Sequence, residues 1–367
     1  MTVNLKNIQP VLLAVALLYF TGCSEPPVPP EVKQVTEQEL ALWRAGVPLY
    51  LPEEYEEYRK ALIKARSDLI RERSRFILFR NYAGIQSEFR RLLENGNALS
   101  GQLEEKKREF SRKTEEILLS FSDQIDMLKG LSKTMNEGRL ARRELIQAEV
   151  ILIEAKKRFA AGDFTGADER ISSLAGHMNA AEKTLCPIVE RYSDTGQIEQ
   201  WRKWVSDTVA ESRKRNIPVI VVNKSERTLT LYKKGAVYKT YRIGIGRNGS
   251  MDKLHAGDHA TPEGKYRIIK KLGRSRYHKA LLINYPNEED RRRFDRAKKQ
   301  GLIPRTVSIG GLIEIHGGGK DSMTYGCIAM DNSRIDELFA MVPVGTPVTI
   351  VGAVESGNRL SSAIGGN

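Results

Sequence analysis

The stretch Ile217-Pro218-Val219-Ile220-Val221-Val222-Asn223 marks the point where the sequence changes its hydrophobic pattern. Before it, in residues 31–213, apolar residues recur every three or four positions, which is the period of helices that pack along one face. From Ile217 on, short runs rich in Val, Ile, Tyr and Thr are typical of strands. The sequence therefore predicts an α-helical region, residues 31–213, followed by a β-rich domain, residues 216–352.

The β-rich domain is expected to contain several short strands with one or two helices packed on them. A Lys-Gly turn at 234–235 separates two of the strands, and the charged run 291–300 is typical of a surface helix. Glycines 244, 246 and 249 lack the spacing and the helix of a phosphate-binding loop, so we interpret them as loop glycines. The predicted strands are 217–223, 228–232, 237–243, 266–269, 312–315 and 348–351.

The helical region carries apolar stripes that predict helices packed as a coiled coil or as helical hairpins. One stripe has a seven-residue repeat, and the other a 3-4-3 spacing. Their members are Leu62, Leu69, Phe76 and Ala83, and then Leu118, Phe121, Ile125 and Leu128. The residues of these stripes carry no reactive side chains. We therefore expect the helical region to be a spacer or a docking module, which in the second case binds a protein partner.

Three turns are predicted inside the helical region. The first two are Asn95-Gly96-Asn97 and Asn136-Glu137-Gly138, because Asn and Gly favour turns. The third is Gly162-Asp163, with Phe159 and Phe164 expected to pack across it. This segment resembles one helix–turn–helix unit of tetratricopeptide repeats, but no fixed period follows it, so an ordinary helical hairpin explains it as well.

The three cysteines are too few for a disulfide scaffold, and the repeated Cys/His pairs of a structural zinc site are missing. Cys186 lies in an apolar helix pattern and is interpreted as a buried, inert thiol. His255 and His259 lie in a glycine-rich stretch without a third ligand, so a zinc site is not expected there. The prediction is no metal and no organic cofactor.

The first residues have the pattern of an export signal. Lys6 precedes the apolar run 11–20, which is too short to span a bilayer, and the run ends at Thr21-Gly22-Cys23. The arrangement resembles a bacterial lipoprotein signal, residues 1–22, with Cys23 as the lipidated residue. The resemblance implies a lipid anchor in the cell envelope, on the outer membrane where the cell has one. The proline-rich segment 23–30 is then an extended tether.

Charge is distributed unevenly along the chain. Residues 24–214 hold 32 Lys or Arg and 32 Asp or Glu, whereas residues 215–355 hold 25 against 14. The basic character of the second region suits an anionic partner, although a solvated surface explains it equally well. Nucleic acid is not expected as the partner behind an export signal. The last residues, 353–367, are interpreted as a flexible tail.

Two segments of the β-rich domain carry candidate catalytic side chains. His316 ends an apolar strand and precedes three glycines, and Cys327 follows a glycine shortly before a helix predicted at 334–342. The positive end of that helix is expected to lower the pKa of the thiol, and an imidazole can take its proton. The backbone amides of Tyr325, Gly326 and Cys327 are candidates for an oxyanion hole. A structural cysteine beside an incidental histidine explains the same residues.

The segment from His316 to Cys327 resembles the active-site motif of the YkuD family of bacterial L,D-transpeptidases. That motif runs from His-Gly to Ser/Thr-x-Gly-Cys, which here is Thr324-Tyr325-Gly326-Cys327. Residues 257–264 resemble the family's Gly-Asp to Thr-Pro-x-Gly element, and residues 342–348 resemble its closing strand. Tyr325 stands where family members commonly have His, and the short interval between His316 and Cys327 is closer to the YafK-like branch.

The resemblance implies a two-step acyl transfer on peptidoglycan stem peptides. Cys327, activated by His316, attacks the carbonyl of the third residue of a tetrapeptide stem and releases D-Ala, while the Gly317 carbonyl orients the imidazole. An amine then resolves the thioester to form a cross-link, with Thr324, Tyr325 and Gly326 on the oxyanion and substrate side. Two alternatives remain open: a hydrolytic relative, acting as an L,D-carboxypeptidase or a peptidoglycan–protein amidase, and a non-catalytic peptidoglycan-binding lipoprotein. Tyr277-His278 and Tyr285-Pro286-Asn287 resemble a substrate-side segment of the YafK-like branch and are expected to line the cleft, with Arg291–Arg296 as its lid.

Overall fold

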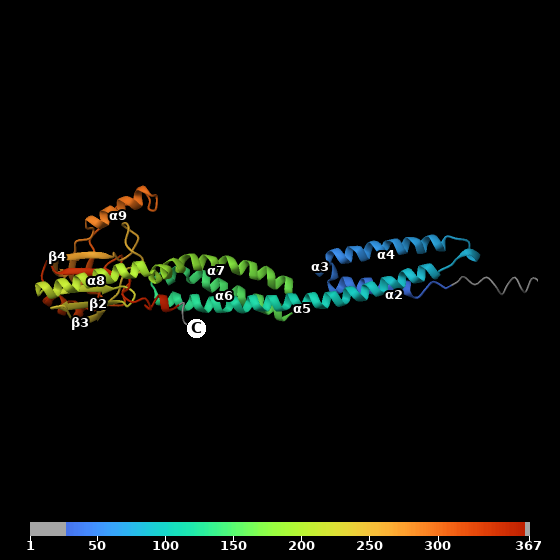
Figure 1. The fold of residues 1–367 in the computed structure, drawn as a ribbon, viewed down its shortest axis with the longest axis horizontal. Helices are drawn as coiled ribbons and strands as arrows, with labels where there is room; N and C mark the ends of the chain where they lie inside the picture. The colour runs from blue at the N-terminus through green and yellow to red at the C-terminus, as the bar shows by residue number, and fades with distance from the viewer. Residues whose placement is uncertain (1–26, 364–367) are drawn as a thin grey trace, which may run out of the picture. The chain divides into compact units, whose positions relative to one another are not determined.

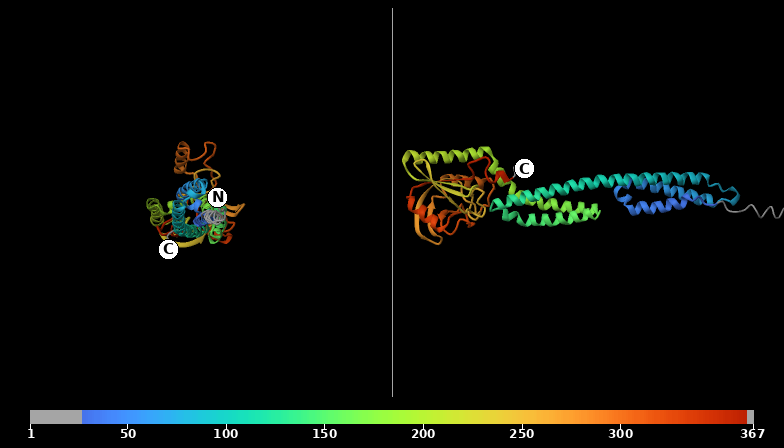
Figure 2. Two further views of the ribbon diagram at one scale, coloured as in Figure 1. Left: turned by 90° about the vertical axis from the view of Figure 1, so that its right-hand side faces the viewer. Right: turned by 90° about the horizontal axis from the view of Figure 1, so that it is seen from below.

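A computed structural model describes residues 27–363 (Figure 1). The predicted signal, Cys23 and the first part of the tether lie outside the described residues. A helical region precedes a sheet-containing domain, which confirms the predicted fold class (Figure 2). The chain divides into two compact units between Glu115 and Glu116, a point inside the long helix α5, Ala83–Thr134. The second half of the helical region therefore belongs to the same unit as the sheet.

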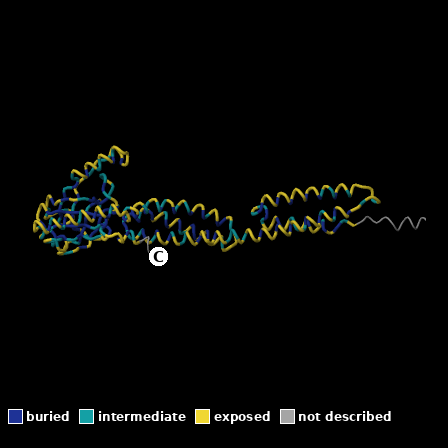
Figure 3. The backbone as a smooth tube through the Cα atoms, viewed as in Figure 1, coloured by how far each residue is buried: buried dark blue, intermediate teal, exposed yellow. Residues whose placement is uncertain are grey.

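The N-terminal unit is built from helices around one apolar core. Helix α2, Glu31–Ala45, leads through α3, Val47–Tyr50, into α4, Pro52–Arg73, and the short 3-10 helix η2, Ile77–Phe79, precedes α5. Gly46 ends α2 in the left-handed conformation that glycine adopts at low cost, with φ at 91°. The buried residues of this core come mainly from α2, α3, α4 and the first part of α5, and buried positions are dark blue in Figure 3.

The turn predicted at 95–97 is wrong, because α5 continues through it without interruption. The residues there serve a close contact between helices instead. A Cβ at Gly96 would lie 2.2 Å from Oε1 of Gln38. The Gln38 amide donates to the carbonyl oxygen of Leu93 and to Oδ1 of Asn97. Gly96 and Asn97 therefore allow close packing against α2. Their residue types alone do not distinguish this role from a role in a turn.

The seven-residue stripe is buried only within α4. Leu62 and Leu69 are buried, as predicted. Phe76, the next member, is 66% exposed because α4 ends at Arg73 and the chain leaves the helical period. The 3-4-3 stripe is confirmed: Leu118, Ile125 and Leu128 are buried, and Phe121 is partly buried.

The second unit begins with a bundle made from the end of α5, α6, Gly138–Ala160, and α7, Phe164–Ser193, followed by α8, Thr195–Arg215. The turns predicted at 136–138 and at Gly162-Asp163 are confirmed. Phe159 and Phe164 pack across the second turn with their ring centroids 5.5 Å apart. Oδ1 of Asp163 accepts the Gly166 amide and so caps α7.

The described part of the β-rich domain has one eight-stranded sheet in the order β3-β2-β1-β8-β4-β5-β6-β7. The strand bounds are β1 Val219–Asn223, β2 Thr228–Lys233, β3 Ala236–Arg242, β4 Gly264–Ser275, β5 His278–Ile283, β6 Glu314–His316, β7 Ile328–Ala329 and β8 Pro347–Val351. Strand β1 pairs with β8 in parallel, and so does β6 with β7, while the other pairs are antiparallel. Strands β5 and β7 were not predicted.

In the described part of the chain, two helices pack on the sheet, and a third lies on the surface of the domain. Helix α8 packs on β8, where the hydroxyls of Thr208 and Thr349 lie 2.6 Å apart. Helix α9, Glu288–Lys299, confirms the charged surface helix, and α10, Asn332–Met341, confirms the helix after the cysteine. The apolar side chains of the strands and of α10 form the core of the domain.

Residues 353–363 pack against the helices, which corrects the prediction of a flexible tail for this part. Ala353 and Leu360 are buried in the same apolar cluster as α6 and α7. The Asn358 side-chain amide donates to the carbonyl oxygen of Tyr192 at 2.7 Å. Because the residues of this segment are mostly small or polar, its hydropathy does not predict these contacts.

Two features are absent from the described residues. No helix within residues 27–363 combines the length and hydrophobicity that crossing a bilayer requires. In the same range, no three or more His, Cys, Asp or Glu side chains are grouped so that they could hold a metal ion.

Candidate active site

Strand pairing brings His316 and Cys327 into neighbouring positions. Strands β6 and β7 run in parallel, with Ile315 opposite Ile328 and His316 opposite Ala329. Cys327 directly precedes β7 and lies two positions before Ala329. Because side chains alternate between the faces of a sheet, the register directs the side chains of positions 316 and 327 to one face. The two predicted residues therefore face the same side of the sheet, on and just before its neighbouring strands β6 and β7.

The His316 imidazole is buried and oriented by its own backbone. Only 4% of the residue is exposed, and Nδ1 lies 2.5 Å from the carbonyl oxygen of Gly317. A carbonyl oxygen only accepts hydrogen bonds, so Nδ1 carries the proton and Nε2 keeps its lone pair. Burial lowers the pKa of His316, although the bond to Gly317 opposes this effect. The ring is therefore held as a neutral base.

Tyr277, from the turn between β4 and β5, covers one side of this ring. The two ring centroids lie 4.5 Å apart with an interplanar angle of 24°, which is a stacked arrangement. The next residue, His278, turns away and pairs with Asp336 through Nε2 at 2.7 Å. Of Tyr277 and His278, both expected to line the cleft, Tyr277 is thus the one whose ring contacts the His316 ring.

Asn332, which the sequence places in the turn and N-cap 331–333 before a predicted helix, fixes the glycines after His316. Its Oδ1 accepts the Gly318 amide at 2.9 Å. A Cβ at Gly317 would lie 2.5 Å from the same oxygen and 2.6 Å from the carbonyl oxygen of Tyr277. Gly317 therefore has to be glycine for the chain to pass between Asn332 and Tyr277. No motif marks Asn332 beyond its place at the start of a predicted helix.

Cys327 is only partly exposed, and its sulfur lies beside Leu312, two residues before the strand that carries the histidine. Sγ is 3.7 Å from the carbonyl oxygen of Leu312, which can accept a hydrogen bond from the thiol. Burial raises the pKa of Cys327, and a bond from the Glu314 backbone opposes this shift. The sequence predicted a pKa lowered by a helix dipole, but β7 lies between Cys327 and α10. At rest the thiol is therefore protonated.

The turn before Cys327 is closed by Thr324. Its hydroxyl donates to the carbonyl oxygen of Cys327 at 2.6 Å and accepts the Gly326 amide at 3.1 Å. Gly326 has a φ of 127°, and a Cβ there would lie 2.6 Å from the carbonyl oxygen of Ala260. The Gly326 amide is thus engaged, whereas the amides of Tyr325 and Cys327 make no hydrogen bond to any described residue. Those two are the amides available to an oxyanion.

Tyr325 forms an exposed rim next to the cysteine. The residue is 64% exposed, and its ring contacts the His259 ring edge-on with centroids 4.9 Å apart. The Arg247 guanidinium lies 5.2 Å from the centroid of the Tyr325 ring. The structure thus brings a cation and an imidazole to the side chain of Tyr325, where a substrate carboxylate could bind.

The loop glycines at 244 and 246 allow close backbone packing under this site. Gly244 pairs with Ala329, and Gly246 pairs with Thr324. A Cβ at Gly244 would lie 2.4 Å from the Ser322 carbonyl oxygen, and one at Gly246 would lie 2.2 Å from that of His259. The interpretation as loop glycines is confirmed, and their role is to admit the cysteine segment.

A buried charge network joins the helices to the domain behind the site. Both carboxylate oxygens of Glu263 accept from Arg191 on α7, at 2.9 and 2.6 Å. Lys224 donates to Oε1 at 2.7 Å, and the Trp201 indole donates to Oε2 at 3.0 Å. The side chains of Lys224 and Glu263 are 0% and 1% exposed. Burial opposes ionisation of Glu263, but Lys224 and Arg191 outweigh it and lower its pKa to about 2.

This network is continuous with the segment that supports the cysteine turn. Glu263 lies two residues after Thr261, whose hydroxyl oxygen accepts a hydrogen bond from the Gly246 amide at 2.9 Å. The Glu263 amide donates to Oδ1 of Asp252, and the other oxygen of Asp252 pairs with Arg293 of α9. Arg293, expected in a lid over the cleft, is instead part of this network.

The turn between α5 and α6 contacts the same loop from the helical side. The Asn136 amide donates to the Gly246 carbonyl oxygen at 2.7 Å, and Arg139 donates to that of Arg247 at 2.6 Å. Glu137 accepts the Ser250 amide at 2.8 Å. The helices of the second unit therefore hold the loop on which Gly246 and Arg247 lie.

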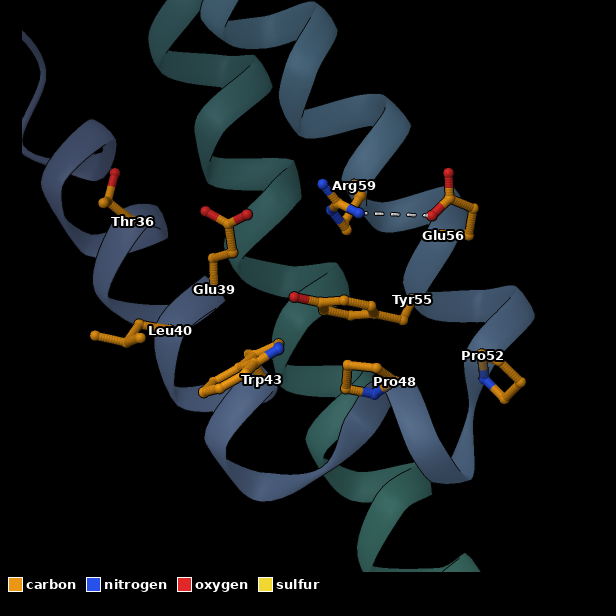
Figure 4. Close-up of a pocket in the computed structure, with 9 residues that line it drawn as sticks. All are labelled: Thr36, Glu39, Leu40, Trp43, Pro48, Pro52, Tyr55, Glu56 and Arg59. Carbon is orange, nitrogen blue, oxygen red and sulfur yellow. Dashed lines mark ion pairs between the residues drawn. The ribbon is translucent and has the colours of Figure 1, made fainter.

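The N-terminal unit has a groove of its own, with a volume of about 750 Å³. It opens between α2, α3 and α4, with the rings of Trp43 and Tyr55 and the Pro48 side chain around it (Figure 4). The complete lining is Thr36, Glu39, Leu40, Trp43, Pro48, Pro52, Tyr55, Glu56 and Arg59. It contains neither Cys nor His, so the nucleophilic chemistry considered for Cys327 has no counterpart there.

The site's geometry agrees with the result of a comparison with protein families. Residues 217–350 match the family model described as the L,D-transpeptidase catalytic domain, YkuD. The β-rich domain is a YkuD domain. The matched range begins just before β1, ends within β8 and contains His316 and Cys327.

Two relatives share this domain. YafK of Escherichia coli strain K12, provisionally named an L,D-transpeptidase, is 36% identical over 129 residues. This match covers 34% of the present chain and 46% of YafK, which is less than half of that protein. YqjB of Bacillus subtilis strain 168, named in the same way, is 28% identical over 134 residues, covering 36% of the chain and 70% of YqjB.

Solved structures with some likeness to the chain include L,D-transpeptidases. One from Mycobacterium tuberculosis H37Rv is 16% identical, with 36% of this chain and 57% of that chain covered and a TM-score of 0.24. One from Xylanimonas cellulosilytica is also 16% identical, with 37% and 60% covered and a TM-score of 0.25.

Proposed function

We propose that this protein is a cysteine-dependent L,D-transpeptidase that acts on peptidoglycan stem peptides in the cell envelope. The observation that carries the proposal is the orientation of His316. Its Nδ1 proton is held by the Gly317 carbonyl, so Nε2 is a base on the sheet edge where Cys327 lies. The YkuD match of residues 217–350 supplies the substrate class.

The first step transfers an acyl group to the cysteine. His316 Nε2 takes the thiol proton of Cys327 as the sulfur attacks the carbonyl carbon of the third stem residue. The amides of Tyr325 and Cys327 donate to the oxygen that becomes negative. Collapse of this intermediate breaks the peptide bond, and the imidazolium returns the proton to the amine of D-Ala, which leaves. A thioester to Cys327 remains.

The second step regenerates the cysteine. The side-chain amine of another stem attacks the thioester carbon and gives its proton to His316. The carbon–sulfur bond breaks, and the thiolate takes a proton, so the product is a new amide bond. Burial raises the pKa of Cys327 and lowers that of His316, so the neutral pair is the resting state and the proton moves only as the bond forms.

The proposed location rests on the sequence pattern of residues that precede the described structure. We propose that Cys23 is the lipid attachment site and that the domain works on the periplasmic face of the envelope, held there by the anchor. Growth with labelled fatty acid should label the chain, and Cys23→Ala should abolish the label. A label that persists in Cys23→Ala would contradict this attachment site.

The reaction can be tested by mass spectrometry of purified muropeptides. Residues 24–367 are incubated with tetrapeptide muropeptides, beside Cys327→Ala and the control Cys186→Ala, which removes the other described cysteine. Cross-linked dimers that have lost D-Ala should form with the wild type and with Cys186→Ala but not with Cys327→Ala. Shortened stems without dimers would point to the hydrolytic alternative. Unchanged substrates in all samples would contradict an enzyme and favour a peptidoglycan-binding role.

A further inference from the structure

The segment between α4 and α5 exposes three large apolar side chains at adjoining positions. Phe76 is 66% exposed, Leu78 67% and Phe79 66%, and the centroids of the two phenylalanine rings lie 6.2 Å apart. We call these three residues the apolar tip. Exposed apolar side chains scattered singly need no explanation, but a cluster at one turn usually marks an interaction site.

The backbone of the tip is fixed, so the apolar side chains are presented to solvent by a defined structure. Glu72 accepts from the Arg75 guanidinium at 3.1 Å and from the Asn81 amide at 2.7 Å. The Arg80 side chain donates to the Arg75 carbonyl oxygen at 2.9 Å. Tyr82 is buried in the core immediately after the turn. These contacts close the turn at its base and leave the tip outside the core.

The charge around the tip is positive. Residues 71–80 contain four arginines, at 71, 73, 75 and 80, and a single acidic residue, Glu72. Arg71 pairs with Asp68 and Arg75 pairs with Glu72, so the segment keeps an excess of positive charge beside the apolar tip. Such a segment fits a surface that is apolar in its interior and negatively charged at its outer face. The interface of a bilayer with anionic headgroups has these properties.

The tip lies at the same end of the N-terminal unit as the start of the described chain. Glu31, the first residue of α2, accepts from Gln86 at 2.9 Å and from Arg90 at 3.1 Å, on the first turns of α5. Figure 1 shows the turn after α4 at the same end of the unit as the beginning of α2. The segment from Cys23 to Glu31 reaches at most about 28 Å when fully extended. A lipid on Cys23 would thus keep the tip close to the bilayer.

We propose that Phe76, Leu78 and Phe79 insert into the interface of an anionic phospholipid bilayer while the neighbouring arginines contact its headgroups. This second contact would orient the N-terminal unit on the membrane, which a lipid on a proline-rich tether does not do by itself. It depends neither on the chemistry of Cys327 nor on lipidation, so it can be tested without either.

The test measures binding of residues 24–367, which retain every described residue, to vesicles of phosphatidylglycerol and phosphatidylethanolamine. The variant Phe76→Ser/Leu78→Ser/Phe79→Ser should bind about 100-fold more weakly, because three apolar side chains no longer leave water. The matched control is Leu119→Ser/Ile146→Ser/Ile153→Ser, whose side chains are 56%, 50% and 62% exposed. It should bind like the wild type. Equal binding by both variants would overturn the proposal.

Two measurements distinguish a bilayer from a protein partner. Leu78→Trp should add fluorescence that brominated lipids quench, whereas the fluorescence that Leu119→Trp adds should not be quenched. Binding should weaken on phosphatidylcholine vesicles and at high salt, because the arginine contribution is electrostatic. The alternative outcome is that the wild type sediments as a dimer, the tip variant sediments as a monomer, and the wild type binds no vesicles. In that case the tip is an interface between two copies and the proposal is wrong.

Discussion

Replacing Glu263 with Gln tests whether the buried charge network holds the helices to the catalytic domain. Glutamine keeps the shape of the side chain but removes its charge. Lys224, whose side chain is 0% exposed, and Arg191, whose side chain is 20% exposed, then lose their principal anionic partner. The amide oxygen of glutamine can still accept one hydrogen bond, but its nitrogen cannot accept, so the bidentate pair with Arg191 is broken and neither cation keeps a charged partner at this position.

The expected cost follows from the burial of these partners. Breaking a buried ion pair by removing one member costs about 3–5 kcal/mol, because the remaining charge stays out of water without compensation. Asp252 lies near enough to both cations to offset part of this loss. We therefore expect Glu263→Gln to lower the free energy of unfolding of the second unit by about 3 kcal/mol.

The matched control is Asp207→Asn. Asp207 pairs with Lys265 at 2.8 Å between α8 and β4, but the two side chains are 49% and 47% exposed. Exposed pairs of this kind contribute about 0–1 kcal/mol because water and salt screen them. Both substitutions remove one carboxylate from a pair between a helix and the sheet domain, so the difference between them measures the effect of burial.

Urea unfolding followed by tryptophan fluorescence gives the two free energies, because Trp201 lies in the network. Equal slopes of the unfolding free energy with urea would show that the surface exposed on unfolding has not changed. If Glu263→Gln costs no more than Asp207→Asn, the network does not stabilise the contact between helices and sheet, and the reasoning is refuted.

Three further predictions concern the site. Gly326→Ala should destabilise the fold by about 1–3 kcal/mol and reduce turnover, because φ is 127° and Cβ would lie 2.6 Å from the Ala260 carbonyl oxygen. Gly345→Ala, strained in φ but with nothing within 4 Å, should cost less by thermal unfolding and leave turnover intact. In a Cys186→Ala background, iodoacetamide should alkylate Cys327 with a midpoint above the ordinary thiol pKa, since burial raises it; a plateau at neutral pH would contradict this. Burial and the nearby Glu263 raise the pKa of Asp252 to about 6, so its contribution to stability is full below its ordinary value of 3.8 and is lost as pH rises through about 6. Urea unfolding across that range should show this decline in the wild type relative to Asp252→Asn, and parallel curves would rule it out.

Local pattern alone determined the elements that depend on a continuous period. The helices, the turn at Gly162-Asp163 and the strands around Val219 and Leu229 lie where hydrophobic spacing predicts them, because burying one face of each element sets that spacing. The residues of the YkuD motif, His316 and Cys327 among them, could also be picked out without coordinates.

Tertiary structure decided what depends on contacts between distant segments. The residue types around Gly96 are those of a turn, yet α5 continues through this position. The missing Cβ of Gly96 leaves room for the Gln38 side chain of α2. The thiol of Cys327 has a raised pKa rather than a lowered one, because packing around the sulfur outweighs a helix that lies beyond β7. Burial and close approach arise only when the chain has folded, so neither could be read from residue order. Asn332 and Glu263 have no marked sequence signal for the same reason, and their partners lie 14 residues and 72 residues away along the chain.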